Sequence, residues 1–292
     1  MANYLSGKVS IVAIGVASAG TPVSTGSGTS AVTLTPSGSA AWACVPSAHE
    51  IVSVVLSTGK LGTPITLGGT PDAIAITSHS GTLTAWVANS STNQLDEVNL
   101  TTRAIEAHVP VGHEPVAVAI TPDGSTAYVV DAGSDAVTPV TLSSATAGSE
   151  IPVGRDPTAI AISNDGQTAA VVDKGDGAVT PIILTDATPG TEIPVPGATA
   201  VAFGKSDLRP YVVSSTSDEL FALRIGSRKV VEIAATGSSP IAIYVEPLTP
   251  LAIVIDKTTS KLNEIDLATG KSFWQTAVGS GPVALAVNVS AS

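Results

Sequence analysis

Cysteine is almost absent from this sequence. Its 292 residues include one, Cys44, so no disulfide can form within the chain. Cys44 lies in an apolar, strand-like segment, where we expect a small buried hydrophobic residue rather than a catalytic thiol. The sequence also lacks any uninterrupted apolar run of about 18 residues, the minimum for a transmembrane helix. We therefore expect no membrane insertion.

The sequence has few charged residues, and fewer basic residues than acidic ones. Charged residues make up 13% of the chain, with 13 Lys and Arg against 24 Asp and Glu, for a net charge of -11. Binding to nucleic acid needs a basic face, so this balance argues against it as a partner. The sequence has no HExxH or HxxxH motif, no GxSxG motif and no phosphate-binding glycine loop before a helix. We predict no catalytic residue, metal ligand or cofactor from motifs.

What the sequence does contain is an internal repeat. The segment 115–154 recurs in 157–195, and the remainder of the chain consists of more divergent copies. Each copy reads as four short strands joined by Gly- and Pro-containing turns, which in the first copy fall at 116–120, 127–130, 137–142 and 151–153. The first strand is apolar on both faces, so both faces should be buried. Pro139 and Pro181 fall inside third strands, which predicts bulges or N–H positions turned away from a partner.

A sheet with two apolar faces cannot bury both alone, and a radial stack of such sheets solves the problem. We therefore predict an all-β fold, a seven-bladed β-propeller of four-stranded antiparallel blades, in a single domain over 1–292. The repeat units are 29–70, 71–114, 115–156, 157–197, 198–239 and 240–281. Trp42, Trp86, Tyr128 and Tyr211 share one repeat position, which favours packing between blades over a ligand platform.

The seventh blade is predicted to combine both ends of the chain. Residues 282–292 match a first strand, and residues 3–26 match the third and fourth strands of the unit at 131–154. This closure blade, 282–292 plus 1–28, is about three residues short of the repeat period, all within its second strand. The stretch 8–20 also resembles a short signal peptide, but the repeat explains the same residues position by position.

One polar position recurs at the end of the second strand. Around the ring it is occupied by Asn3, Val45, Asn89, Asp131, Asp173, Ser214 and Asp256. Such residues commonly accept backbone N–H groups in a hairpin turn, and that is the interpretation we favour. Alternatively, a ring of carboxylates could supply oxygen ligands to a divalent cation.

The linkers between blades share a glycine and a proline, which we interpret as backbone requirements, and they vary at the two residues between that glycine and proline. Two adjacent linkers place four ionisable residues there: His113, Glu114, Arg155 and Asp156. In a propeller these linkers should emerge on the same face as the turns between second and third strands. They would form either solvated ion pairs or the rim of a binding site. We include Asn89, Asp131, Asp173 and Asp256 in the same candidate face.

The unit resembles the YVTN-type β-propeller repeat of bacterial and archaeal surface and periplasmic proteins. The matching features are Pro115, the turn 121–124, the Tyr-Val-Val-Asp of 128–131 and the closing 151–154. The resemblance covers essentially the whole chain, and it implies an extracellular, cell-surface or periplasmic location and a ligand- or protein-binding scaffold. Repeats of this kind occur in proteins of many roles, so the resemblance indicates fold more than activity.

Two functions fit these observations. The first is a non-enzymatic scaffold, expected to be a monomer, which binds a protein or glycan on the face of the linkers. The alternative is an enzyme dependent on Ca²⁺ or Mg²⁺, lactonase- or lyase-like, with its site at the central channel. That enzyme would need the carboxylates of Asp131, Asp173 and Asp256 to converge with Asn89.

Overall fold

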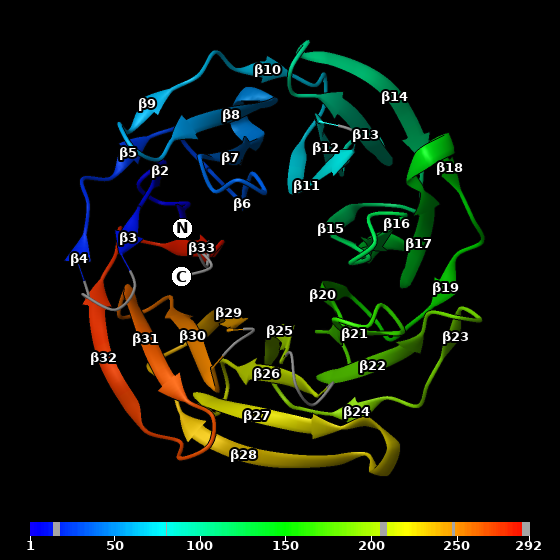
Figure 1. Cartoon of the computed structure of the whole chain (residues 1–292). Coiled ribbons are helices and arrows are strands. Elements are labelled where there is room, and N and C mark those ends of the chain that lie inside the picture. Colours follow the sequence, from blue (N-terminus) through cyan, green and yellow to red (C-terminus); the bar gives the residue numbers. More distant parts are fainter. Residues whose placement is uncertain (14–17, 80, 205–208, 247–248, 288–292) are drawn as a thin grey trace.

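The computed structural model describes residues 1–13, 18–79, 81–204, 209–246 and 249–287, so the last five residues of the predicted closure blade lie outside it. Within these residues, seven antiparallel sheets form a ring with the first strand of each sheet innermost (Figure 1). The helical segments are short 3-10 turns at Pro46–Ala48, Ala132–Ser134, Leu142–Ser144 and Ile225–Ser227. The predicted all-β, seven-bladed propeller is confirmed. No described helix has the length and apolarity to cross a bilayer.

Both ends of the chain meet in the closure blade. Its sheet has the order β33 (Pro282–Ala284), β1 (Ala2–Asn3), β2 (Lys8–Val9) and β5 (Val23–Ser24). The ladder of β3 (Val12–Ala13) with β4 (Ser18–Ala19) lies at its outer side. Because β33 pairs with β1, the ring closes between a C-terminal first strand and an N-terminal second strand. The second strand has only two residues, which agrees with the predicted shortfall.

The other six blades each come from one continuous segment, numbered here in chain order. Blade 1 contains β6 (Val32–Leu34), β7 (Ala40–Val45), β8 (Glu50–Val55), β9 (Lys60–Leu61) and β10 (Ile65–Thr66). Blade 2 contains β11 (Pro71–His79), β12 (Thr82–Asn89), β13 (Gln94–Asn99) and β14 (Ala104–Pro110). Blade 3 contains β15 (Pro115–Ile120), β16 (Thr126–Asp131), β17 (Ala136–Thr141), β18 (Thr146–Ala147) and β19 (Ile151–Pro152).

The second half of the ring repeats this plan. Blade 4 contains β20 (Pro157–Ile162), β21 (Thr168–Asp173), β22 (Ala178–Ile183), β23 (Thr188–Pro189) and β24 (Ile193–Pro194). Blade 5 contains β25 (Ala198–Phe203), β26 (Pro210–Ser214), β27 (Glu219–Arg224) and β28 (Lys229–Ala235). Blade 6 contains β29 (Pro240–Val245), β30 (Leu251–Asp256), β31 (Lys261–Asp266) and β32 (Ser272–Ala277).

The hydrophobic core lies between neighbouring blades. Alternate residues of a strand face opposite sides of its sheet, so β16 contributes to two interfaces. Val129 packs with Trp86 of blade 2, whereas Tyr128 packs with Val171 of blade 4. The side chains at the shared aromatic position are buried, as packing between blades predicts. Cys44 is fully buried as well, and burial raises the pKa of its thiol.

Pro139 leaves the third strand of its blade regular, but the fourth, outer strand of that blade is interrupted beside it. Tyr128 pairs with Pro139 in a regular register, so β17 carries no bulge there. The Gly148 N–H donates to the Pro139 carbonyl at 2.7 Å, and the missing N–H of Pro139 points the same way. The outer strand is divided at this point into β18 and β19. Of the two predicted outcomes, the N–H position that faces no ladder partner is the one observed.

Candidate functional site on the linker face

The linkers lie on one face together with the turns that join second and third strands, as predicted. Hydrogen bonds connect the two sets, and we call this the linker face. The Arg155 N–H donates to Asp176 Oδ2 at 2.6 Å, in the turn of blade 4. The Asp156 N–H donates to Asp135 Oδ1 at 2.8 Å, in the turn of blade 3. The backbone of the linker before blade 4 is therefore fixed by the turns on both sides of it.

The linker that precedes blade 3 has the same construction. The His113 N–H donates to Ser134 Oγ at 2.9 Å, and the Glu114 N–H donates to Asn93 Oδ1 at 3.0 Å. Glu114 has a φ of 52° and Asp156 a φ of 49°, in the left-handed region that L-residues enter only when the surroundings impose it. The hydrogen bonds supply that restraint.

The four side chains predicted as a rim are exposed above this fixed backbone. Arg155 Nη2 lies 2.8 Å from Asp176 Oδ1, and the Arg155 side chain is 73% exposed. The hydrogen bond from the Arg155 N–H, together with the one from its side chain, lowers the pKa of Asp176, and the side-chain hydrogen bond raises the pKa of Arg155. The Asn93 amide nitrogen lies 3.2 Å from His113 Nδ1. Lys174 Nζ lies 4.0 Å from Asp156 Oδ2.

The ring of Asx residues lies beneath this surface and not on it. Asn89, Asp131, Asp173 and Asp256 are buried, with at most 1% exposure. Each contacts a third-strand residue of its own blade, diagonally across the sheet. Thr138 Oγ1 donates to Asp131 Oδ2 and Thr180 Oγ1 donates to Asp173 Oδ2, both at 2.6 Å. The same relation joins Asn3 to Ser10, Asn89 to Asp96 and Asp256 to Asn263.

Backbone capping of the turn, the interpretation that the sequence favours, is seen at one ring member, Ser214, whose Oγ also donates to the Pro196 carbonyl at 2.7 Å. Ser214 Oγ accepts the N–H groups of Thr216 and Ser217, both at 3.3 Å. In the five pairs described above, the side chain at the ring position instead forms a hydrogen bond with a side chain of the third strand. Blade 1 has no such polar pair, because the ring position is Val45 and its diagonal neighbour on the third strand is Val52. The ring is therefore chiefly a set of internal cross-strand pairs.

Burial controls the ionisation of the three ring carboxyls. It raises the pKa of Asp131 to about 6, of Asp173 to about 7 and of Asp256 to about 6, against the opposing effect of the hydrogen bonds. In each, Oδ1 accepts no hydrogen bond from the described residues. An unpartnered buried carboxylate oxygen is unfavourable, so protonation is favoured at each of these sites.

The linker glycines lie directly against these buried side chains. A Cβ on Gly112 would lie 2.7 Å from Asp131 Cβ, and one on Gly154 would lie 2.7 Å from Asp173 Cβ. Neither glycine has a positive φ, so close packing rather than backbone conformation requires glycine there. The linker thus covers the ring residue of the blade that follows it.

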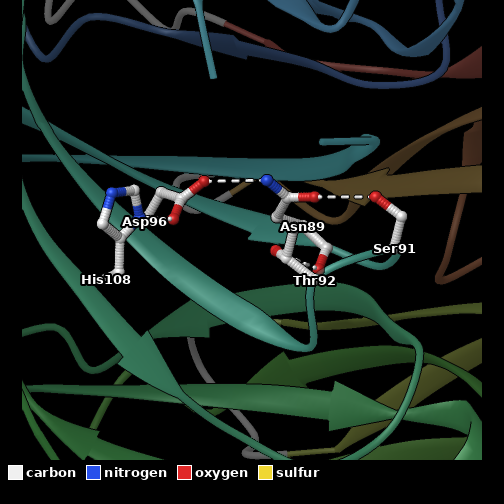
Figure 2. Close-up of polar contacts among 5 residues, drawn as sticks. All are labelled: Asn89, Ser91, Thr92, Asp96 and His108. Carbon is white, nitrogen blue, oxygen red and sulfur yellow. Dashed lines mark hydrogen bonds and ion pairs between the residues drawn. The ribbon is translucent and has the colours of Figure 1, made fainter. Parts of the chain in front are cut away.

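One buried acid and its histidine were missed by the sequence reasoning. His108 Nδ1 lies 2.7 Å from Asp96 Oδ1, and Asn89 Nδ2 donates to Asp96 Oδ2 at 3.0 Å (Figure 2). The Asp96 side chain is fully buried, whereas that of His108 is 52% exposed. The available signal was the spacing from Asn89 to Asp96, which equals that from Asp131 to Thr138.

The structure brings the predicted site residues together in part. His113 and Glu114 share one linker, and Arg155 and Asp156 share the next. The ring residues remain in separate blades, each beside its own cross-strand neighbour. Across the described ranges, no three His, Cys, Asp or Glu side chains lie close enough to hold a metal ion.

Comparison with known proteins supports the fold. No protein-family model and no curated protein matches this chain. Hydrazine synthase from Kuenenia stuttgartiensis is similar in structure, with a TM-score of 0.79 and 16% identity over 89% of each chain. Virginiamycin B lyase from Staphylococcus aureus has a TM-score of 0.71 and 16% identity, over 88% of this chain and 87% of its own. At this identity the likeness shows the fold alone, which is the seven-bladed β-propeller.

Proposed function

We propose that this chain is a non-enzymatic, YVTN-type propeller that binds a protein or glycan partner on the linker face. The observation that carries the proposal is the contrast between the fixed linker backbone and its exposed side chains. His113, Glu114, Arg155 and Asp156 extend from a backbone held at both sides by neighbouring turns. A rigid scaffold that presents variable polar side chains lowers the entropic cost of binding. The resemblance to surface and periplasmic repeats adds an extracytoplasmic location to the proposal.

The test compares two variants, each of which removes charges of both signs. Alanine at His113, Glu114, Arg155 and Asp156 should abolish capture of partners from an extract or a glycan array. Alanine at Lys229 and Glu232, which are exposed on the outer strand β28, should leave capture unchanged. Equal melting temperatures would show that both variants fold. Undiminished capture by the fourfold variant would refute the proposed face.

The ion-dependent enzyme is the second candidate, and we give it lower rank. It needs ring carboxylates that share an ion, whereas Asp131, Asp173 and Asp256 each pair within their own blade. The melting temperature with Ca²⁺, with Mg²⁺ and with a chelator separates the two. An ion that binds only the folded state at a hundredfold excess over Kd stabilises it by about 2.7 kcal/mol. A shift of that kind would reverse the ranking.

A further inference from the structure

One turn on the linker face differs in chemistry from the others. It joins β1 to β2 of the closure blade over residues 4–7 and begins with Tyr4 and Leu5. Tyr4 is 51% exposed and Leu5 is 75% exposed, so this turn presents two adjacent apolar side chains to solvent. The equivalent turns of the other blades contain none of Phe, Trp, Tyr, Leu, Ile, Val and Met: 46–49, 90–93, 132–135, 174–177, 215–218 and 257–260.

Leu5 covers the linker before its blade, which reverses the contact seen in blade 3. There the linker side chain covers the turn, since a Cβ on Gly133 would lie 3.0 Å from His113 Cβ, and blade 4 repeats this contact. In the closure blade the glycine is in the linker instead. A Cβ on Gly281 would lie 2.5 Å from Leu5 Cγ. Where blades 3 and 4 expose polar linker side chains, the closure blade therefore exposes apolar ones from its turn.

Tyr4 extends toward the other linker of the blade, 26–29, which leads to blade 1. A Cβ on Gly28 would lie 3.6 Å from Tyr4 Cε2 and 3.8 Å from Ser47 Oγ, so the ring and the hydroxyl both adjoin this glycine. Ser47 is exposed, and its Oγ donates to the Ser27 carbonyl at 2.5 Å, which leaves the hydroxyl oxygen free to accept hydrogen bonds. An aromatic ring and a hydroxyl acceptor thus lie next to each other on the surface.

The backbone of this turn is attached to both flanking linkers. The Tyr4 N–H donates to the Gly281 carbonyl at 2.8 Å, and the Gly26 N–H donates to the Gly7 carbonyl at 3.2 Å. A ligand that contacts the turn therefore meets a backbone that is already ordered, which lowers the entropic cost of binding.

The surface around the two apolar side chains is uncharged. Apart from Tyr4 and Leu5, the turn 4–7 and the linkers 26–29 and 279–281 consist only of Gly, Ser and Thr. One face of a pyranose ring carries C–H groups that stack on an aromatic ring, while its hydroxyls form hydrogen bonds at the edge. An aromatic ring bordered by hydroxyls and without charge matches a neutral sugar.

The size of this apolar surface also favours a sugar over a protein. A stable protein interface buries about 800 Å² on each partner around a cluster of large side chains. Two adjacent side chains provide much less, and they match one or two sugar units. Among the described residues, the other exposed large apolar side chains lie in strands and not in the turns or linkers of this face: Val55, Leu61, Ile183 and Phe273.

We propose that Tyr4 and Leu5 form a subsite for a neutral sugar unit of a glycan. The apolar face of the sugar stacks on the Tyr4 ring beside Leu5, and a sugar hydroxyl donates to Ser47 Oγ. This rests on the proposed function for its premise that the linker face binds a partner, and it assigns the chemical class of that partner. It uses none of the four ionisable linker side chains.

Binding can be measured on an array of neutral and acidic glycans with the full chain, labelled fluorescently. We expect the parent to bind neutral glycans. Tyr4→Ala should bind them at least about tenfold more weakly, because the stacking surface is lost. Tyr4→Phe keeps the ring and should bind nearly as well as the parent. Phe273→Ala removes an equally exposed ring from the outer strand β32 and should bind as the parent does. Equal melting temperatures would show that all three variants fold.

The alanine variant at 113, 114, 155 and 156 separates this proposal from the one on which it rests. Loss of neutral-glycan binding in both this variant and Tyr4→Ala supports both proposals. Loss in Tyr4→Ala alone supports the subsite and refutes the role of the four ionisable side chains. Loss in the fourfold variant alone overturns the subsite. Absence of neutral-glycan binding by the parent also overturns it, including the case in which Tyr4 is needed only for capture of a protein.

Discussion

Blade 3 and the closure blade are built on one pattern but joined in different ways. Blade 3 is a single segment whose second strand, β16, has six residues and is buried along most of its length. The second strand of the closure blade, β1, has two residues and meets its first strand from the opposite end of the chain. Even so, the contact of Asn3 with Ser10 reproduces that of Asp131 with Thr138.

The comparison shows which contacts the two blades share. Gly279 packs on Asn3 in the closure blade as Gly112 packs on Asp131 in blade 3. The polar pair and the covering glycine are therefore kept where the strand is shortest. β1 comprises the end of the second strand nearest the linker face, and the ring closes through it.

The largest expected effect comes from removing a large second-strand side chain from blade 2. Trp86 is 2% exposed and packs between blades 2 and 3. Trp86→Ala should lower the free energy of unfolding by about 3–5 kcal/mol, through lost burial and a new cavity. Urea denaturation would measure it, with Phe273→Ala as the exposed control, expected within about 0.5 kcal/mol of the parent. A loss below about 1 kcal/mol would contradict tight packing of Trp86 between blades 2 and 3.

A smaller effect is expected from the covering glycines. Gly112→Ala places a Cβ 2.7 Å from Asp131 Cβ and should cost about 1–3 kcal/mol. Gly279→Ala places a Cβ 2.8 Å from Asn3 Cγ. Because β1 has only two residues in its ladders, Asn3 can shift more easily than Asp131, so we expect Gly279→Ala to lower stability less than Gly112→Ala does. Gly226→Ala, with no atom within 4 Å of the added Cβ, is the neutral control. Melting temperatures rank the three variants, and equal losses at Gly112 and Gly279 would contradict the difference in restraint.

The fold could be predicted from sequence because the repeat is regular and its turns use Pro, Asp and Gly in their ordinary roles. The short second strand of the closure blade follows from comparing the residues available at the two ends of the sequence with the repeat period. The burial of Asp131 and Asp173 was not, because it results from a linker that belongs to the preceding repeat. The sequence suggests that the linker glycine is needed for its backbone conformation. In the structure, Gly112 and Gly154 instead leave room for the side chains of Asp131 and Asp173 in the next blade. The cross-strand partners were also missed, since each lies seven residues further along, beyond the turn.

The smallest expected effect concerns ionisation, where the closure blade and blade 4 differ. The closure blade has neutral Asn3 at the ring position, whereas blade 4 has Asp173, whose pKa burial raises to about 7 from an ordinary value of 3.8. Between these values the folded state binds more protons than the unfolded state, so stability falls as pH rises from about 4 to about 8.

Asp173→Asn makes blade 4 resemble the closure blade and should remove its share of this pH dependence. At pH 8 the variant should be more stable by about 1 kcal/mol, less than the pKa shift alone would give, because the amide accepts a weaker hydrogen bond from Thr180. At pH 4, where the parent carboxyl is largely protonated, the two should differ little. Asn3→Asp should have the opposite effect, adding a loss of stability at high pH. Melting temperatures at pH 4, 6 and 8 would test both, and a variant Asp173→Asn less stable than the parent at pH 8 would mean that the buried carboxylate is stabilised by a partner.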